Sequence, residues 1–251
     1  MIDLHGQVAV VTGGSRGIGR AACLLLAQCG ADIAFGYRLN QQAAEQVLEE
    51  IRRTSRKGIA VQGDLSRAKD AQLLVTRATE SLGRLDILVN NHGIWKDGPI
   101  ESMSETEWDE MLDVNLKGIF LCTQAAVPVM KRQGRGRIIN LASTAGQRGE
   151  SLHSHYAASK GGIISFTKSL GPELCRHGIL VNCVAPGWVD TDMSAEALAG
   201  PDRDKILATI PMGRPGSPEE VAAGIVFFAS RLADYCCGEI LNINGGSVLC
   251  G

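Results

Sequence analysis

Tyr156 and Lys160 are two residues whose types and spacing are suited to acid–base chemistry. A separation of four residues places both side chains on one face of a helix. A free tyrosine has a pKa of about 10, which is too high for efficient proton exchange near neutral pH. A neighbouring ammonium favours the phenolate and lowers that pKa. We therefore predict that Lys160 lowers the pKa of Tyr156 and makes the phenol a general acid for ketone reduction.

Two further polar residues fit the same chemistry. Ser143 follows a predicted strand, and its hydroxyl is suited to hold a substrate oxygen near Tyr156. Asn115 stands in an apolar helical stretch, where an amide is costly unless it is hydrogen-bonded. Taken singly, each of these residues also has an ordinary explanation as a packed aromatic, a surface charge, a cap or a buried hydrogen-bonding group.

A glycine-rich loop, residues 12–19, joins the first predicted strand to the first predicted helix. Its glycines at 13, 17 and 19 let the backbone turn sharply and approach a ligand closely. The helix start adds free N–H groups and the positive end of the helix dipole. A plain strand–helix turn would use the same glycines, but this position is that of a dinucleotide pyrophosphate site.

The residues after the second predicted strand bear on the choice of cofactor. An NAD enzyme places Asp or Glu there to bind the ribose 2′-OH, whereas this chain has Tyr37 and Arg38. A guanidinium can hold a 2′-phosphate, and we expect Arg16 in the glycine loop to reach the same phosphate from the other side. Both arginines are also compatible with solvated surface charges. We expect NADP(H), with NAD(H) as the alternative.

Alternating strands and helices must position these residues. Strands are predicted at 8–11, 33–35, 59–61, 87–89, 137–141, 180–184 and 240–243, and helices at 20–28, 41–53, 68–82, 104–130, 156–170 and 218–230. The strand cores are continuously apolar, as in sheets that are covered on both faces. This pattern predicts an α/β fold: one domain over residues 1–251 with a doubly wound (Rossmann-type) parallel seven-stranded sheet and helices on both faces. The long segment at about 187–215 contains no predicted strand, and we interpret it as a substrate lid.

Composition narrows the class of protein. The chain has 251 residues, of which 45% are hydrophobic and 21% charged, with a formal net charge of −2. These values are typical of a soluble globular protein and do not favour nucleic-acid binding. The sequence has neither a long apolar span nor a signal-peptide pattern, so we expect a cytoplasmic protein without membrane contact.

Cysteine and histidine spacing does not favour a metal site. The eight cysteines contain no Cys-x-x-Cys pair, and we interpret them as reduced thiols. His153 and His155 lack the spacing and the neighbouring carboxylates of a metal centre. We therefore expect no bound metal.

Taken together, these motifs resemble the short-chain dehydrogenase/reductase family over essentially the full length. The matching features, in the order and spacing of that family, are the loop 12–19, Asp64, Asn90 to Gly93, Asn115, Ser143, Tyr156, Lys160 and Pro186-Gly187. Two departures are visible. His92 stands where alanine is usual, and Gly171-Pro172 is expected to interrupt a helix that normally continues.

The resemblance implies hydride transfer between a nicotinamide cofactor and a substrate carbon. It implies a catalytic set of Asn115, Ser143, Tyr156 and Lys160, in which Asn115 orders a water beside Lys160. Asp64 would meet the adenine, and Asn90 and Gly93 the adenosine ribose. The cofactor-binding residues that it implies are Gly13, Ser15, Arg16, Gly17, Ile18, Gly19, Tyr37, Arg38, Asp64, Leu65, Asn90, Gly93, Tyr156, Lys160, Pro186, Gly187, Val189 and Thr191.

Within the family, the pattern looks most like the bacterial 3-oxoacyl-[acyl-carrier-protein] reductases. Arg38 and the segments 90–93, 213–222 and 238–246 carry this likeness. Dehydrogenases of sugars, steroids or other secondary alcohols share these features and remain the alternative. A nucleotide-binding redox sensor without turnover is a third possibility, which the presence of both Tyr156 and Lys160 disfavours.

The same resemblance bears on partners. The substrate is expected to be a small ketone or one linked to an acyl carrier protein. An acidic carrier needs a basic patch beside the site. The candidate patch consists of Lys131, Arg132, Arg135, Arg137, Arg176 and His177. A homotetramer is also implied, with contacts through the helices around 104–130 and 156–176 and through the last strand.

Overall fold

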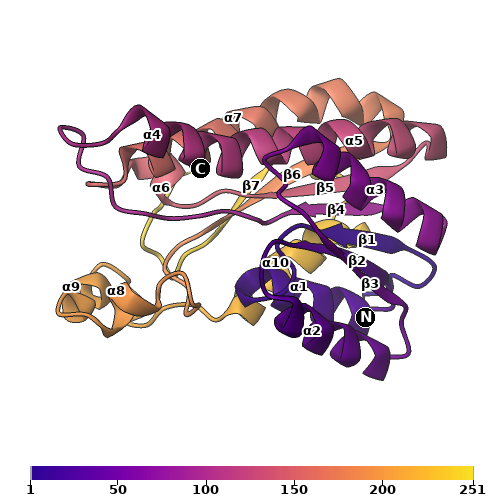
Figure 1. Cartoon of the computed structure of the whole chain (residues 1–251), viewed down its shortest axis with the longest axis horizontal. Helices are drawn as coiled ribbons and strands as arrows, with labels where there is room; N and C mark the ends of the chain where they lie inside the picture. Colours follow the sequence, from indigo (N-terminus) through magenta and orange to yellow (C-terminus); the bar gives the residue numbers. More distant parts are fainter. Residues whose placement is uncertain (1, 251) are drawn as a thin grey trace.

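Seven parallel strands form one sheet at the centre of the molecule (Figure 1). The computed structural model describes residues 2–250, and within them the strand order is β3-β2-β1-β4-β5-β6-β7. The predicted fold class is confirmed. The strands are β1 Val8–Val11, β2 Asp32–Tyr37, β3 Gly58–Gln62, β4 Ile87–Asn90, β5 Gly136–Leu141, β6 Ile179–Pro186 and β7 Ile240–Ile243.

Helices cover both faces of this sheet (Figure 1). One face packs against α1 (Gly17–Gln28), α2 (Gln41–Arg53) and α10 (Pro218–Ala229). The other face packs against α3 (Ala68–Leu82), α5 (Gly118–Gln133) and α7 (Ser154–Leu174). The two buried clusters on either side explain why β1 and the first three residues of β4 are apolar, because neither face of these strands meets water.

Side-chain caps set several helix starts. The Asn40 side chain accepts a hydrogen bond from the backbone N–H of Ala43 at the start of α2. Ser217 and Glu220 form a capping box at α10, where Pro218 takes the first helical position. A second capping box, Ser104 with Glu107, begins α4 (Glu105–Leu112). Such caps satisfy N–H groups that the helix itself leaves free.

The predicted helix at 104–130 is composed of three pieces. After α4, a π-helical turn spans Asp113–Lys117, and α5 then runs to Gln133. The wider turn places Asn115 inside the molecule. Single π turns of this kind often occur at functional sites.

A chain of buried polar side chains links the central strands to the helices above them. Asn90 on β4 donates to Oδ1 of Asn140 on β5 and to Oγ1 of Thr123 on α5, at 2.9 and 3.0 Å. Asn140 in turn donates to Oγ1 of Thr167 on α7 at 2.9 Å. These bonds fix the positions of both helices over the sheet, since each buried amide would be costly without its partners.

The expected break at Gly171-Pro172 is wrong. Helix α7 continues through Pro172 to Leu174, so the proline costs a main-chain hydrogen bond only near the end of the helix. Gly171 has a different role. A Cβ atom at this position would lie 3.0 Å from the backbone N and 3.1 Å from the Cα of Gly238. The glycine therefore lets α7 pack directly against the chain that leads into β7.

The segment 187–215 projects from the carboxyl edge of the sheet and carries two short helices, α8 (Ala195–Ala199) and α9 (Arg203–Ala208) (Figure 1). Its two ends meet. Asp190 N–H donates to the carbonyl of Gly216 at 2.9 Å, and Gly216 N–H donates to the carbonyl of Trp188 at 2.9 Å. None of the described helices has the length and apolarity needed to cross a bilayer.

The contact at Gly171 leads to a stability prediction. Gly171→Ala should lower the free energy of unfolding by about 1–3 kcal/mol, because the added methyl group meets backbone that cannot rotate away. Ser169→Ala, on the exposed side of the same helix, is the control and should change it by less than about 0.5 kcal/mol. Urea unfolding measures both. Equal stability of the two variants would contradict the close-approach explanation.

Candidate active site

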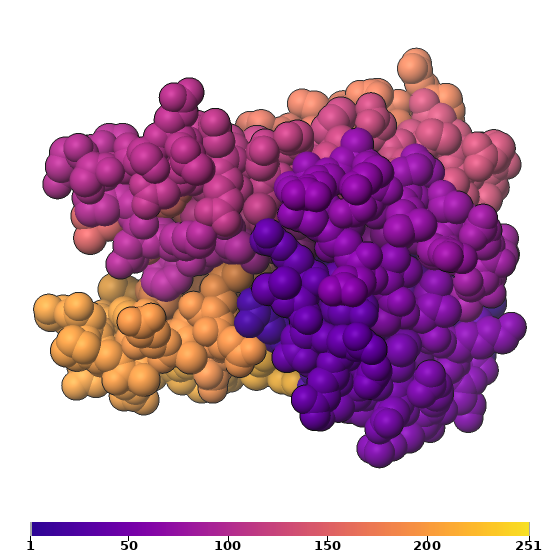
Figure 2. Space-filling model, in the orientation of Figure 1, coloured from indigo at the N-terminus to yellow at the C-terminus, as the bar shows by residue number. Residues whose placement is uncertain are grey.

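The carboxyl ends of the strands border one cavity of about 570 Å³. Figure 2 shows a hollow between the orange segment near residue 200 and the magenta segment near residue 100. The cavity wall includes most of the predicted residues, namely Gly13, Ser15, Arg16, Gly17, Ile18, Tyr37, Arg38, Asp64, Leu65, Gly93, Ser143, Tyr156, Lys160, Pro186, Gly187, Val189 and Thr191. Gly19, Asn90 and Asn115 do not line it.

The glycine loop forms the anion-binding end of this cavity. Gly13 and Gly17 have φ values of +67° and +53°, a conformation that side chains disfavour. Helix α1 begins at Gly17 without a side-chain cap and without an acidic residue in its first turn. Its N–H groups and positive dipole end are thus available to a pyrophosphate. Gly19 serves packing instead, because a Cβ there would collide with the carbonyl of Gly13.

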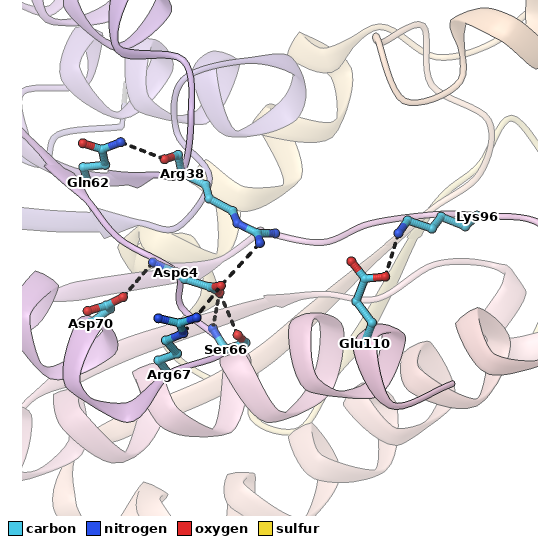
Figure 3. A network of polar contacts seen from close by, with 8 residues as sticks. All are labelled: Arg38, Gln62, Asp64, Ser66, Arg67, Asp70, Lys96 and Glu110. Carbon is cyan, nitrogen blue, oxygen red and sulfur yellow. Dashed lines mark hydrogen bonds and ion pairs between the residues drawn. The ribbon is translucent and has the colours of Figure 1, made fainter. Parts of the chain in front are cut away.

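Charged side chains gather at the end of β2 and β3 (Figure 3). Arg38 Nη2 lies 3.5 Å from Asp64 Oδ2, and Ser66 donates to Asp64 Oδ1 through its N–H and its hydroxyl. Burial raises the pKa of Asp64, but the Ser66 hydrogen bonds and the charges of Arg38 and Arg67 outweigh it, so the pKa is lowered. The carboxylate holds the half-exposed Arg38 guanidinium at the cavity wall.

Arg16 also lies on the cavity wall. Its Nη1 is 3.7 Å from Oδ2 of Asp192, and both side chains are largely exposed. An exposed pair of this kind contributes little to stability, so the guanidinium is free to exchange this partner for a phosphate.

Tyr156 and Lys160 lie side by side in the interior end of the cavity. Their exposed fractions are 9% and 5%, and Lys160 Nζ lies 5.7 Å from the centre of the Tyr156 ring. The ammonium donates to the carbonyl of Leu141, at the end of β5, at 2.9 Å. Helix α7 thus brings both groups to the sheet edge together.

The predicted lowering of the tyrosine pKa is wrong for this structure. Burial raises the pKa of Tyr156 to about 12, although the neighbouring Ser143 hydroxyl lowers it. Burial also lowers the pKa of Lys160 to about 8. Removal from water disfavours whichever form is charged, so the phenol and the ammonium shift in opposite directions.

Ser143 faces Tyr156 from the loop after β5. Its Oγ accepts a hydrogen bond from the N–H of Ala145 at 3.1 Å, which fixes the hydroxyl at the start of α6 (Ala145–Arg148). The hydroxyl proton remains available to a substrate oxygen. This arrangement can hold an oxygen atom beside a proton-bearing phenol.

Asn115 is fully buried behind the cavity wall. Its Oδ1 accepts from Ile94 N–H at 2.8 Å, and its Nδ2 donates to the Ile94 carbonyl at 2.9 Å and to Ser159 Oγ at 3.2 Å. These bonds fix the loop after β4 to α7. A Cβ on Gly93 would lie 3.1 Å from Asn115 Oδ1 and 3.6 Å from Lys160 Nζ, so the Gly93 backbone is close to both groups.

Asn90 does not line the cavity. Its side chain points into the polar chain with Asn140 and Thr123, where it steadies the sheet edge. The next residue, Asn91, lines the cavity instead. Its Nδ2 donates to the carbonyls of Thr12 and Gly13 at 2.9 and 3.2 Å and ties the glycine loop to β4.

His92, the departure from the family pattern, is accommodated by a glycine. Its imidazole is buried and has Nδ1 2.8 Å from Thr12 Oγ1. Its Nε2 occupies space that a Cβ on Gly118 would fill. Burial, with a smaller contribution from the charge of Lys160, lowers the pKa of His92 to about 4, so the ring is neutral.

The cavity also has wall residues outside the predicted catalytic and cofactor-binding sets, and of these the sequence reasoning missed Trp95. Trp95, Trp188, Arg148 and Glu150 line it at the end near Tyr156. The charge of Glu150 contributes to the raised pKa of that phenol. A signal for Trp95 was present in the sequence, because it stands in the loop after a predicted strand, at the carboxyl end where ligands bind in this fold class.

The proposed basic patch is wrong in position. Residues 131–137 join the end of α5 to the start of β5, and 176–177 precede β6, so both lie at the amino edge of the sheet, opposite the cavity. Arg135 lies 3.4 Å from the buried Asp86, and Arg137 pairs with Asp234. Among residues 2–250 there is also no group of three or more His, Cys, Asp or Glu suited to a metal ion.

The chain is similar to known oxidoreductases along nearly its whole length. The family model described as short chain dehydrogenase matches residues 7–202. A 3-oxoacyl-[acyl-carrier-protein] reductase of Synechocystis sp. is 42% identical over 250 residues, covering 99% of this chain and 100% of the relative. A reductase of the same name from Staphylococcus aureus is 41% identical over 238 residues, or 95% of this chain and 96% of the relative.

A solved structure has the same architecture. It is a crystal structure assigned to a short-chain alcohol dehydrogenase of Sinorhizobium meliloti. The TM-score is 0.94 at 35% sequence identity, and the match covers 98% of this chain and 97% of the other.

The orientation of Asn90 leads to a testable distinction. Asn90→Ala should lower the free energy of unfolding by about 1–3 kcal/mol, because Asn140 and Thr123 lose a buried partner. The Kd for a reduced nicotinamide cofactor, measured by cofactor fluorescence, should change by less than twofold. A variant of normal stability that binds the cofactor tenfold more weakly would support the assignment of Asn90 to the cofactor.

Proposed function

The chain belongs to the short-chain dehydrogenase family, and from this premise we propose that it uses NADPH to reduce a ketone to a secondary alcohol, with Tyr156 as the proton donor. The observation that carries the proposal is the buried pair of Tyr156 and Lys160 beside Ser143, in the cavity that the glycine loop also borders. Acid–base groups, an oxygen-binding hydroxyl and an anion site thus share one cavity.

The residues of the wall fit a dinucleotide. The open N-terminus of α1, with Ser15, Gly17 and Ile18, is suited to the pyrophosphate, and Asp64 and Leu65 to the adenosine. The absence of a carboxylate at Tyr37-Arg38 and the nearby guanidiniums of Arg38 and Arg16 favour a 2′-phosphate, hence NADP(H) over NAD(H). Pro186, Gly187, Val189 and Thr191 are the wall proposed for the nicotinamide carboxamide. When bound, the reduced nicotinamide supplies the hydride.

The protein's own residues manage the proton. Burial keeps the proton on the Tyr156 phenol at neutral pH. Oη can donate it to the oxygen that the Ser143 hydroxyl holds, because the alkoxide formed by hydride addition is a stronger base than the phenolate, even with the pKa of Tyr156 raised to about 12. The phenolate that remains is stabilised by the ammonium of Lys160, whose own pKa of about 8 suits it to return a proton. Asn115 supports this pair by fixing Ile94 and the loop that carries Gly93.

For the substrate we propose a 3-oxoacyl group, the substrate class named for the relatives. Carriage by an acidic carrier protein is part of the proposal, but the basic residues at 131–137 do not provide its docking surface because they lie at the opposite edge of the sheet. Segment 187–215 is proposed to cover the bound substrate. A cytoplasmic homotetramer completes the proposal, and the exposed Phe120 on α5 is an apolar group that such an interface would bury.

The first test removes the phenolic proton. Tyr156→Phe should lower kcat for NADPH oxidation with ethyl acetoacetate by about 10²–10⁴-fold, the usual contribution of a general acid. The Kd for NADPH should stay within about twofold of wild type, because the ring is kept. Undiminished turnover in this variant would refute the assigned chemistry, and a wild-type protein that binds NADPH without oxidising it would favour the sensor alternative.

The second test concerns cofactor preference. Arg38→Asp should lower the NADPH/NADH ratio of kcat/KM by about 10–100-fold, because a charge-assisted hydrogen bond to the 2′-phosphate is replaced by repulsion. Arg67→Asp is the matched control, since Arg67 also lies near Asp64 but not on the cavity wall. A ratio that changes equally in both variants would count against a role for Arg38 in cofactor choice.

A further inference from the structure

The cavity has an aromatic corner beside the proposed reaction centre. Two of the three tryptophans in the chain, Trp95 and Trp188, line the cavity. Trp95 belongs to the loop after β4, and Trp188 to the loop after β6. The centres of the rings are 6.0 Å apart and their planes meet at 82°, so the indoles form two walls at nearly a right angle.

The Trp95 indole is held in position by His153, which stacks on one of its faces. The imidazole of His153 stacks on Trp95 with 4.5 Å between ring centres and an angle of 4° between planes. Ring atom Nδ1 of His153 lies 2.9 Å from the carbonyl of Ser151, and Nε2 lies 2.8 Å from Oδ1 of Asp97, a close contact without hydrogen-bond alignment. The stacked imidazole covers one face of the indole and restricts its rotation.

The loop that carries Trp95 is anchored on both sides. Gly98 N–H donates to the carbonyl of Leu152 at 2.7 Å, which links the loop to the residues just before α7. On the other side, Lys96 Nζ lies 2.7 Å from Oε2 of Glu110 on α4 (Figure 3). Because the loop is fixed before a ligand arrives, little conformational entropy is lost on binding.

The corner adjoins the reacting groups. Trp95 packs against the buried cluster of Met111, Ala145 and Tyr156, and Ala145 is the residue whose N–H fixes the Ser143 hydroxyl. Trp188 directly follows Gly187, part of the wall proposed for the nicotinamide. A group attached to a carbonyl held between Ser143 and Tyr156 therefore extends toward the two indoles.

We propose that Trp95 and Trp188 are specificity-determining residues that select ketones bearing a planar apolar ring next to the carbonyl. The proposal rests on the proposed function, because the ketone must first reach Tyr156. A flat ring in a right-angled corner meets one indole face to face and the other edge to face, the two arrangements that aromatic pairs prefer. A linear alkyl chain buries area there without these contacts and loses rotational freedom.

The experiment compares two 3-oxo esters that differ beyond the ketone carbon. Ethyl benzoylacetate carries a phenyl ring, and ethyl 3-oxohexanoate carries a propyl chain. Trp95→Leu and Trp188→Leu should each lower the aryl/alkyl ratio of kcat/KM by about tenfold, which corresponds to the roughly 1.4 kcal/mol expected of an aromatic pair. Trp95→Phe keeps a ring and should recover most of the ratio.

The third tryptophan provides the control. Trp108 on α4 is half-exposed and does not line the cavity, so Trp108→Leu should leave the ratio within twofold of wild type. Only variants that keep the wild-type sedimentation coefficient and the wild-type Kd for NADPH are compared, which excludes misfolded protein. The ratio itself cancels any general loss of activity.

The outcomes separate this inference from the proposed function. Turnover of both esters with an aryl/alkyl ratio that the Trp95 and Trp188 variants do not change would overturn the aromatic corner and leave the reductase intact. Absence of turnover with either ester in wild type would be a failure of the proposed function. In that case the corner is tested by binding of the two alcohol products to the NADP⁺-saturated Trp108→Leu protein, in which Trp95 and Trp188 are the remaining indoles. Quenching of their fluorescence by the aryl alcohol but not by the alkyl alcohol would support the corner, and equal quenching by both would overturn it.

Discussion

The parallel direction of all seven strands is the constraint on which the site depends. It brings every carboxyl end to one edge of the sheet, and β1 pairs there with β2 on one side and with β4 on the other. The chain order reverses at this point, so the connections after β1 and β4 leave toward opposite faces and a crevice opens between them. The glycine loop, Asn91 and Trp95 border the crevice because each of them follows one of these two strands.

Burial gives this crevice its acid–base character. Tyr156 and Lys160 belong to one helix, and removal from water raises the pKa of the phenol and lowers that of the ammonium. Both shifts favour the neutral forms: the phenol holds its proton more firmly and the amine less firmly, so the pKa of Tyr156 comes to lie above that of Lys160. The carbonyl of Leu141 retains the lysine in this position through its hydrogen bond.

Elements with local determinants could be predicted well from the sequence. The bounds of α2 and α3 match the predicted 41–53 and 68–82, because capping and amphipathic spacing act within each segment. Most residues of the cavity wall could also be predicted, because the glycine loop and the Tyr156–Lys160 spacing are local sequence patterns. Features that depend on tertiary position could not be predicted: the inward turn of Asn90, the passage of α7 through Pro172 against Gly238, and the edge of the sheet on which residues 131–137 lie. The direction of the pKa shift of Tyr156 could not be predicted either, since the spacing to Lys160 contains no information about burial.

The paired backbone hydrogen bonds between residues 188–190 and Gly216 have an evolutionary consequence. They join the two ends of the projecting segment at its base. The positions of these ends relative to the sheet therefore do not depend on the residues between them. Doubling the length of a closed loop costs only about 0.6 kcal/mol in entropy. Insertions, deletions or whole replacements between these ends can therefore diversify what the enzyme accepts while the strands and the helix carrying Tyr156 stay as they are.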